Sequence, residues 1–229
     1  WGKDANWWVL DLATGDSVNV TRGVATSFIN TADDHNNLYP PPAAARGWSS
    51  DGKFVLLYDG WDVWQVPSSG SGGAINLTGD GRRSQVHYQT LYRFAAPRGG
   101  ARAPRAVDPA DGIDLSQPLY FGTYGEWTKR EGLARVDAGR AGATSLLADD
   151  AHIVVSKARD ADAWVYTRQT FTEFPDYWAF GPAFGAGYRI TDVNPQIKEF
   201  AWSSGTRLVN YTSAKGDRLQ GALYLPANY

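Results

Sequence analysis

The chain has 229 residues, with 22 basic and 24 acidic side chains, a formal net charge of −2 and no cysteine. The lack of cysteine excludes a disulfide framework, a thiolate metal site and a cysteine nucleophile. The nearly balanced charge argues against binding to nucleic acid or to an anionic membrane surface, and no apolar run reaches the ~18 residues of a membrane-spanning helix. The composition instead indicates a folded chain rich in aromatic side chains, with 10 Trp, 12 Tyr and 9 Phe.

Short apolar runs separated by turn residues follow one another along the chain, and helical periodicity is nearly absent. The runs are rich in Val, Tyr, Trp, Phe and Leu, which suit a pleated, half-buried sheet. In chain order the expected strands are residues 6–12, 54–58, 62–66, 119–124, 153–155, 163–169 and 219–225. Many short strands bounded by turns predict an all-β fold.

One pattern of strands recurs and gives this fold a more specific form. Residues 48–78 read as a unit that opens with W-S-S-D-G, continues with two buried strands and closes with an outer strand ending in N-L-T. Parts of the unit recur at residues 7–21, 119–147, 163–191 and 202–209. The spacing fits blades of ~40–50 residues if residues 24–46 and 84–117 form long loops. The sequence therefore predicts a β-propeller of four-stranded antiparallel blades, with a β-sandwich as the alternative.

The expected propeller is a partial one. Residues 1–212 hold about four to five blades' worth of chain, and residues 213–229 are expected to form an exit strand and linker. Position 1 is Trp rather than Met, and it directly precedes the first strand pattern. We therefore expect a piece of a longer chain, with a mature secreted form as the alternative.

Motifs for catalysis and for metal binding are not found. The nucleophile pattern G-x-S-x-G is absent, and the nearest approach to it, G-D-S-V-N at residues 15–19, falls in an expected hairpin. His35, His87 and His152 do not follow a metal-ligand spacing. The acidic stretches 33–37 and 108–114 do not match a calcium loop. We expect no cofactor, no metal site and no catalytic residue in this chain.

Two segments, residues 124–131 and 171–178, crowd aromatic and charged side chains together. Exposed aromatic side chains on loops often contact ligands, whereas packing between neighbouring blades is the alternative interpretation. The candidate substrate or partner contacts are Glu126, Trp127, Glu173, Tyr177 and Trp178.

The last forty residues carry a more specific pattern. The chain reads I-T-D-V-N-P at residues 190–195 and Y-T-S-A-K-G-D-R-L-Q-G-A-L-Y-L-P at residues 211–226. This resembles the junction between propeller and hydrolase domain in the prolyl oligopeptidase family of serine peptidases, which includes dipeptidyl peptidase IV-like enzymes. The stretch T-F-T-E-F-P-D-Y at residues 170–177 is similar to the penultimate blade of that family. The resemblance is specific over residues 163–229 and diffuse before them.

The resemblance implies a propeller that covers an α/β-hydrolase domain carrying a Ser-Asp-His triad. This sequence stops at Tyr229, where such a domain would begin, so no catalytic residue is carried over and the chain alone is expected to be inactive. The implied partners are the chain's own C-terminal hydrolase domain and a peptide substrate, which the propeller would bind and gate. The resemblance leaves aminopeptidase and endopeptidase specificity both open, and the compartment as well.

The alternative function is a stand-alone binding propeller for protein or carbohydrate ligands. A propeller glycosidase would need paired carboxylates at the central channel, and no such pair stands out in the sequence.

Overall fold

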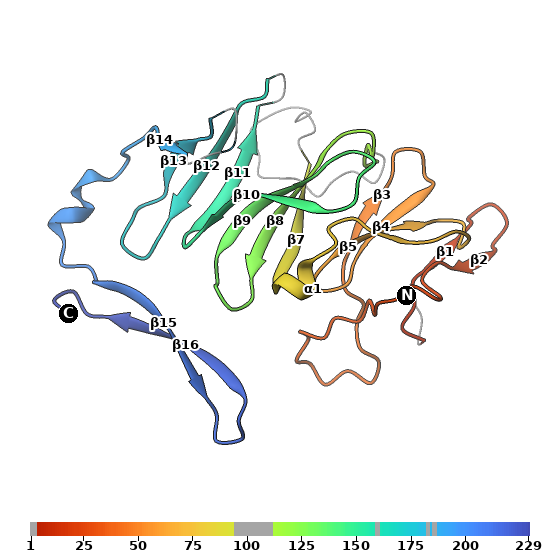
Figure 1. Cartoon of the computed structure of the whole chain (residues 1–229), viewed down its shortest axis with the longest axis horizontal. Coiled ribbons are helices and arrows are strands. Elements are labelled where there is room, and N and C mark those ends of the chain that lie inside the picture. Colours follow the sequence, from red (N-terminus) through yellow and green to blue (C-terminus); the bar gives the residue numbers. More distant parts are fainter. Residues whose placement is uncertain (1–3, 94–111, 159–160, 182–183, 185–186) are drawn as a thin grey trace. The chain divides into compact units, whose positions relative to one another are not determined.

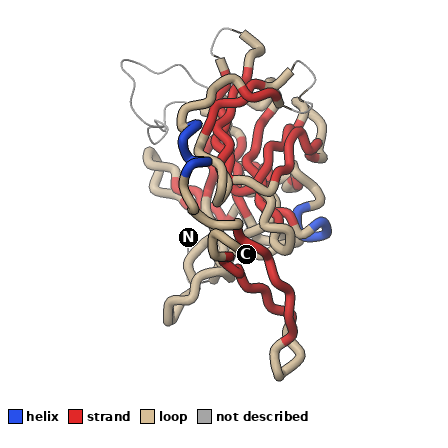
Figure 2. Tube along the Cα trace, turned by 90° about the vertical axis from the view of Figure 1, so that its left-hand side faces the viewer, coloured by secondary structure: helices blue, strands red, loops and turns tan. Residues whose placement is uncertain are grey.

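A computed structural model describes residues 4–93, 112–158, 161–181, 184 and 187–229. The chain divides into two compact units: unit 1 is residues 1–126 with 132–146, and unit 2 is residues 127–131 with 147–229. Within the described residues, helix is limited to α1 (Gly81–Ser84) and a 3-10 helix (Pro195–Glu199), and strands dominate (Figure 2). No helix in the described part of the chain is long and apolar enough to cross a membrane. The expected all-β fold is confirmed.

Four-stranded sheets are the main architectural feature (Figure 1). In each of them the strands lie in chain order, the meander that forms a propeller blade. The first sheet consists of β3 (Ala45–Trp48), β4 (Phe54–Tyr58), β5 (Val63–Pro67) and β6 (Ile75–Asn76). The second consists of β7 (Val86–Tyr92), β8 (Leu119–Gly125), β9 (Glu131–Val136) and β10 (Ala143–Asp149). The third, in unit 2, consists of β11 (His152–Lys157), β12 (Trp164–Gln169), β13 (Asp176–Ala179) and β14 (Tyr188–Arg189).

Two shorter sheets lie toward the ends of the chain. In unit 1, β1 (Trp8–Leu10) pairs antiparallel with β2 (Ser17–Asn19). In unit 2, β15 (Gly205–Thr212) pairs antiparallel with β16 (Arg218–Leu225) over their full length. The expected boundary between residues 212 and 213 falls at the start of the turn of this second hairpin.

The structure differs from the sequence prediction at residues 84–117, which were expected to form a long loop. The segment begins with β7, which pairs antiparallel with β8 and shifts register between Tyr88 and Thr90. Its sequence, V-H-Y-Q-T-L-Y, is dense in β-branched and aromatic residues. The Pro-, Gly- and Arg-rich composition that indicated a loop starts only beyond this strand, and residues 94–111 lie outside the described residues.

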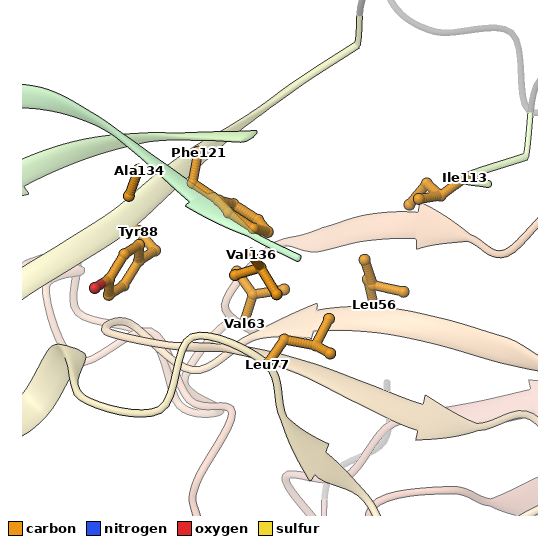
Figure 3. Close-up of a cluster of buried hydrophobic side chains, with 8 residues drawn as sticks. All are labelled: Leu56, Val63, Leu77, Tyr88, Ile113, Phe121, Ala134 and Val136. Atoms are coloured by element: carbon orange, nitrogen blue, oxygen red, sulfur yellow. The ribbon is translucent and has the colours of Figure 1, made fainter. Parts of the chain in front are cut away.

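The sheet β3–β6 is buried on both faces. Neighbouring residues of a strand point to opposite faces, and Leu56 packs into one apolar cluster while Val55 and Leu57 pack into another. The first cluster, shown in Figure 3, joins this sheet to the sheet β7–β10. Its members are Leu56, Val63, Leu77, Tyr88, Ile113, Phe121, Ala134 and Val136. Burial on both faces is the condition under which stacked blades are stable.

Hydrogen bonds of the threonine hydroxyls explain the recurring Thr at the end of the outer strands. The Thr78 hydroxyl donates to Asp62 Oδ1 at 2.6 Å and accepts from Val63 N at 3.1 Å, so it joins the end of β6 to the start of β5. Threonines in two other sheets make the same pair of hydrogen bonds. The Thr21 hydroxyl donates to Asn6 Oδ1 at 2.9 Å and accepts from Trp7 N at 2.9 Å. The Thr191 hydroxyl donates to Asp176 Oδ1 at 2.7 Å and accepts from Tyr177 N at 2.9 Å. One hydroxyl can donate and accept at once, which is why the same residue type recurs at the same place in three sheets.

Candidate functional site

Unit 2 contains a groove of about 1150 Å³. Its lining comes from segments that are far apart in the sequence but belong to the same compact unit. These are Lys129 and Glu131, the β10–β11 turn at residues 150–152, the β12–β13 loop at residues 169–175, the start of β15, and Asn194, Ile197, Phe200 and Trp202 in and around the 3-10 helix. Hairpin turns of the third sheet and the chain leading to β15 therefore face one space.

The β12–β13 loop is folded by its own side chains. The Thr170 hydroxyl accepts hydrogen bonds from the backbone N–H groups of Thr172 (3.3 Å) and Glu173 (3.1 Å). The backbone oxygen of Phe171 accepts a hydrogen bond from Trp202 Nε1 at 3.0 Å. This last bond ties the loop to the segment that leads to β15, so the two sides of the groove hold one another.

Four aromatic rings are exposed where they line the groove. They are Phe171, Phe174, Phe200 and Trp202, with exposed fractions of 45%, 38%, 65% and 65%. Large apolar side chains gathered in one hollow indicate a contact surface rather than scattered surface residues. These rings can stack against apolar, planar or cationic groups.

The groove lining also contains the acidic side chains Glu131, Asp150 and Glu173. Each carboxylate oxygen of Glu131 lies 3.0 Å from His152 Nδ1. The same carboxylate accepts a hydrogen bond from Ile153 N at 3.1 Å. No lysine or arginine pairs with Glu131 among the described residues. Asp150 pairs at 3.3 Å with Arg130. The groove therefore offers a carboxylate that His152 and the backbone hold in place and that no lysine or arginine of the described residues pairs with.

Arg168 fixes the remaining carboxylate of the lining. Its guanidinium donates to Asp149 through Nε (2.7 Å) and Nη2 (3.3 Å), and through Nη1 to Glu173. The hydrogen bond and the charge of Arg168 hold the pKa of Asp149 below its usual value, against the opposing effect of burial. Arg168 thus connects the end of β10 to the β12–β13 loop and positions Glu173 at the groove.

Glu126 and Trp127, two of the predicted contact residues, have structural contacts of their own. Glu126 Oε2 lies 2.9 Å from Nε2 of His87 within unit 1. In unit 2, the Arg218 guanidinium lies over the Trp127 ring, 3.9 Å from its centre, and Gln220 Nε2 donates to the Trp127 backbone oxygen at 2.8 Å. Neither residue lines the groove.

Of the other three predicted contact residues, two lie in a strand and one lines the groove. Tyr177 and Trp178 lie in strand β13 rather than in a loop, and the Trp178 ring stacks on Tyr166 with 6.2 Å between centres. Glu173 lines the groove. Sequence reasoning did not single out Phe200 or Trp202, because nothing local in the sequence shows that residues 200–202 meet the β12–β13 loop.

One cluster of acidic and histidine side chains in the described residues brings possible ligand atoms together. Asp33, Asp34 and His35 bring ligand atoms within 4.8 Å of one another. However, His35 Nδ1 is bonded to Asp33 at 2.6 Å, and Asn37 donates to the same carboxylate at 2.6 Å. These internal bonds account for the cluster. In the second acidic stretch, residues 108–111 lie outside the described residues, and Asp114 accepts hydrogen bonds from Ser116.

Comparison with known proteins adds information on the fold. No protein-family model matches the chain, and no curated protein sequence matches it. Sixty-three chains of solved structure match it. A variant of the AtxE2 isopeptidase with Astexin3-dC4 bound aligns over 97% of this chain at 14% identity, with a TM-score of 0.50.

Two further solved structures are similar over most of the chain. The acylaminoacyl peptidase of Pyrococcus horikoshii aligns over 83% of it at 13% identity, with a TM-score of 0.48. An oligogalacturonate lyase in complex with manganese aligns over 96% at 12% identity, with a TM-score of 0.44, and the match covers 54% of the lyase. The chain spans only 30% of the length of the isopeptidase and of the acylaminoacyl peptidase. Together with the meandering four-stranded sheets, the isopeptidase match supports the β-propeller fold class and assigns no activity.

Proposed function

We propose that this chain is the non-catalytic propeller domain of a longer serine peptidase of the prolyl oligopeptidase family. In this proposal the propeller covers the active site of a following α/β-hydrolase domain, binds peptide substrates and limits which of them enter. Two observations support it: the junction-like sequence of residues 190–226 and the fold shared with an isopeptidase three times as long.

The β15–β16 hairpin carries the proposal. Every residue from Thr206 to Thr212 is exposed, and Leu208, Val209 and Tyr211 are among them. Because successive residues point to opposite faces, both faces of the hairpin present apolar groups to solvent. A two-stranded hairpin without cover is marginally stable in water. The exposed apolar side chains of the segment that resembles the junction therefore support the proposal that a second domain covers it.

The division of labour follows from what this chain contains. In a Ser-Asp-His peptidase the serine attacks the peptide carbonyl, the histidine transfers the proton and the aspartate orients the histidine. None of these groups is assigned to this chain. Its own contribution is steric exclusion of large substrates and contact with the peptide, for which the groove of unit 2 provides aromatic and acidic groups.

The test is to express the whole reading frame that contains this sequence and to compare its product with the 229-residue chain. We expect the longer protein to carry G-x-S-x-G, to be labelled by a fluorophosphonate and to cleave chromogenic peptides. Replacing the serine of that motif by alanine should abolish both signals, and the 229-residue chain should show neither. Cleavage by the 229-residue chain that a serine-directed inhibitor blocks, or a reading frame without the motif, would overturn the proposal.

A second candidate is a stand-alone binding propeller for protein or carbohydrate ligands. The exposed rings of Phe171, Phe174, Phe200 and Trp202 favour it, because such rings stack on sugars and on apolar side chains. A reading frame that ends at Tyr229 would favour this candidate over the first.

A further inference from the structure

We propose that the groove of unit 2 binds a basic side chain, arginine or lysine, of a peptide. That the ligand is a peptide depends on the proposed function. That it carries a positive charge is inferred from the groove itself, whose lining combines preoriented aromatic rings with a carboxylate, Glu131, that pairs with His152 but with no lysine or arginine of the described residues.

The aromatic rings of the groove lining are oriented before any ligand arrives. The indole N–H of Trp202 is held by the backbone oxygen of Phe171 at 3.0 Å, and the Phe171 ring packs on Tyr224 with 5.4 Å between centres. Trp202 and Phe171 nevertheless remain 65% and 45% exposed. An indole ring is the side chain that a cation prefers as an aromatic partner. Groups fixed in advance lose little freedom on binding, so these rings suit a planar guanidinium or an ammonium.

The Glu131 carboxylate has unused capacity to accept hydrogen bonds. An ionised carboxylate offers about four acceptor positions, and in the described structure Glu131 receives donors only from His152 Nδ1 and Ile153 N. Asp150 and Glu173 also line the groove, so in the described part of the chain its lining contains three carboxylates and one lysine, Lys129. The arginine partners of Asp150 and Glu173 leave Glu131 as the carboxylate best placed to pair with a ligand cation.

The carboxylates of Glu131, Asp150 and Glu173 make the lining rich in acceptors. Such a lining favours a ligand rich in donors, and a guanidinium carries five N–H donors and accepts none. An acidic peptide is disfavoured because it would place its carboxylates beside Glu131, Asp150 and Glu173.

Binding is measured on the full 229-residue chain, with no cleavage step. The probes are fluorescein-labelled Ala-Ala-Arg-Ala-Ala amide, the same peptide with citrulline in place of arginine, and the same peptide with glutamate. Citrulline keeps the shape of arginine and removes its charge. In fluorescence anisotropy we expect the arginine peptide to bind at least tenfold more tightly than the citrulline peptide, and added salt to weaken its binding. We expect the glutamate peptide not to bind.

Variants of the groove provide the second half of the test. Glu131→Gln and Trp202→Ala should each weaken binding of the arginine peptide by tenfold or more. The matched control is Glu199→Gln, which removes the same charge from the 3-10 helix of the same unit at a position outside the groove lining, and it should leave binding unchanged. Thermal unfolding of each variant shows whether it is folded. If Trp202→Ala unfolds the chain, Trp202→Phe and the citrulline peptide still decide the question.

Several results would overturn the inference: equal binding of arginine and citrulline peptides, no binding of the arginine peptide at millimolar concentration, or full binding by folded Glu131→Gln. Binding of a neutral oligosaccharide that Trp202→Ala abolishes, with no binding of the arginine peptide, would also overturn it. The result of this binding test can be distinguished from the result of the test of the proposed function. If this chain binds arginine peptides but the longer protein has no peptidase activity, only the proposed function fails, and the reverse result removes only the groove assignment.

Discussion

Two antiparallel hairpins of this chain have the same local structure and opposite surroundings. In β4–β5, Leu56, Leu57 and Val63 are fully buried. In β15–β16, Leu208 is 40% and Leu223 is 48% exposed, although this hairpin is longer and pairs over its full length. Pairing of backbone groups is thus complete in both, while burial of apolar side chains differs.

The difference shows where the stability of a blade comes from. β4–β5 belongs to a sheet with an apolar cluster against each face, and those clusters include residues of a neighbouring sheet. Strand propensity and the turn can form a hairpin, but the free energy of burial is gained only when another layer covers it. β15–β16 has strand propensity without that layer. The comparison predicts that equivalent substitutions will have unequal effects in the two hairpins.

The largest effect is expected for Leu56→Ala in β4. Leu56 is fully buried between two sheets (Figure 3), and removing a buried leucine side chain typically lowers the free energy of unfolding by about 2–5 kcal/mol. Urea unfolding followed by far-UV circular dichroism measures the loss, and hydrogen exchange of β4 amides assigns it to unit 1. A loss below about 1 kcal/mol would contradict the role given to this cluster.

A smaller effect is expected for Thr78→Val, which keeps the side-chain shape and removes the hydroxyl. Val63 N then loses its acceptor, and the buried Asp62 loses one of its donors. Leaving buried polar groups without partners costs about 1–3 kcal/mol. Thr212→Val at the exposed end of β15 is the matched control and should change stability by less than about 0.5 kcal/mol. Equal losses in the two variants would show that the buried threonine does not stabilise the sheet.

The repeat of strands and threonines was largely predictable from the sequence. Residues 48–78 showed a turn, buried strands and a closing Leu-Thr pair, and these became β4 to β6 with Thr78 as the buried link. Strand β7 was missed because a strand of seven residues directly precedes a stretch rich in Pro, Gly and Arg, and composition averaged over the whole segment hid it. Local sequence patterns were thus enough to predict most strands, and the composition of the residues after β7 led to the wrong start of the predicted loop.

The groove was much less predictable. Both segments flagged for aromatic and charged side chains contribute to its lining, through Glu131 in the first and Phe171 and Glu173 in the second. Trp202 and His152 were not flagged, because they meet these residues only through the folding of unit 2. Tyr177 was selected as a contact residue together with the residues before it, but it lies in β13, whose pairing with β12 starts at Asp176.

Unit 2 has a polar link of its own whose contribution depends on pH. Arg168 lowers the pKa of Asp149 from its ordinary value of about 3.9. Since the pKa in the folded state is below that in the unfolded state, the pair stabilises unit 2 fully above about pH 4 and loses this contribution as the pH falls below it. For a partly exposed pair we expect about 1 kcal/mol.

Asp149→Asn should therefore lower the stability of unit 2 at pH 6 and have less effect at pH 3. Urea unfolding at both pH values, with hydrogen exchange in β12 as the local readout, measures the difference. Asp217→Asn, in the turn between β15 and β16, provides a control without an arginine partner among the described residues. An equal loss at the two pH values would contradict the assigned link.

The smallest effect is expected for Leu223→Ala in β16, the counterpart of Leu56→Ala. Leu223 is 48% exposed, so the substitution should change the free energy of unfolding of this chain by less than about 0.5 kcal/mol. The same substitution should cost about 2 kcal/mol or more in a longer protein whose next domain covers the hairpin, because the side chain would then be buried. Measuring both by urea unfolding separates a hairpin that is intrinsically exposed from one that awaits a partner. If Leu223→Ala is equally mild in the longer protein, this face of the hairpin is not the surface that the next domain covers.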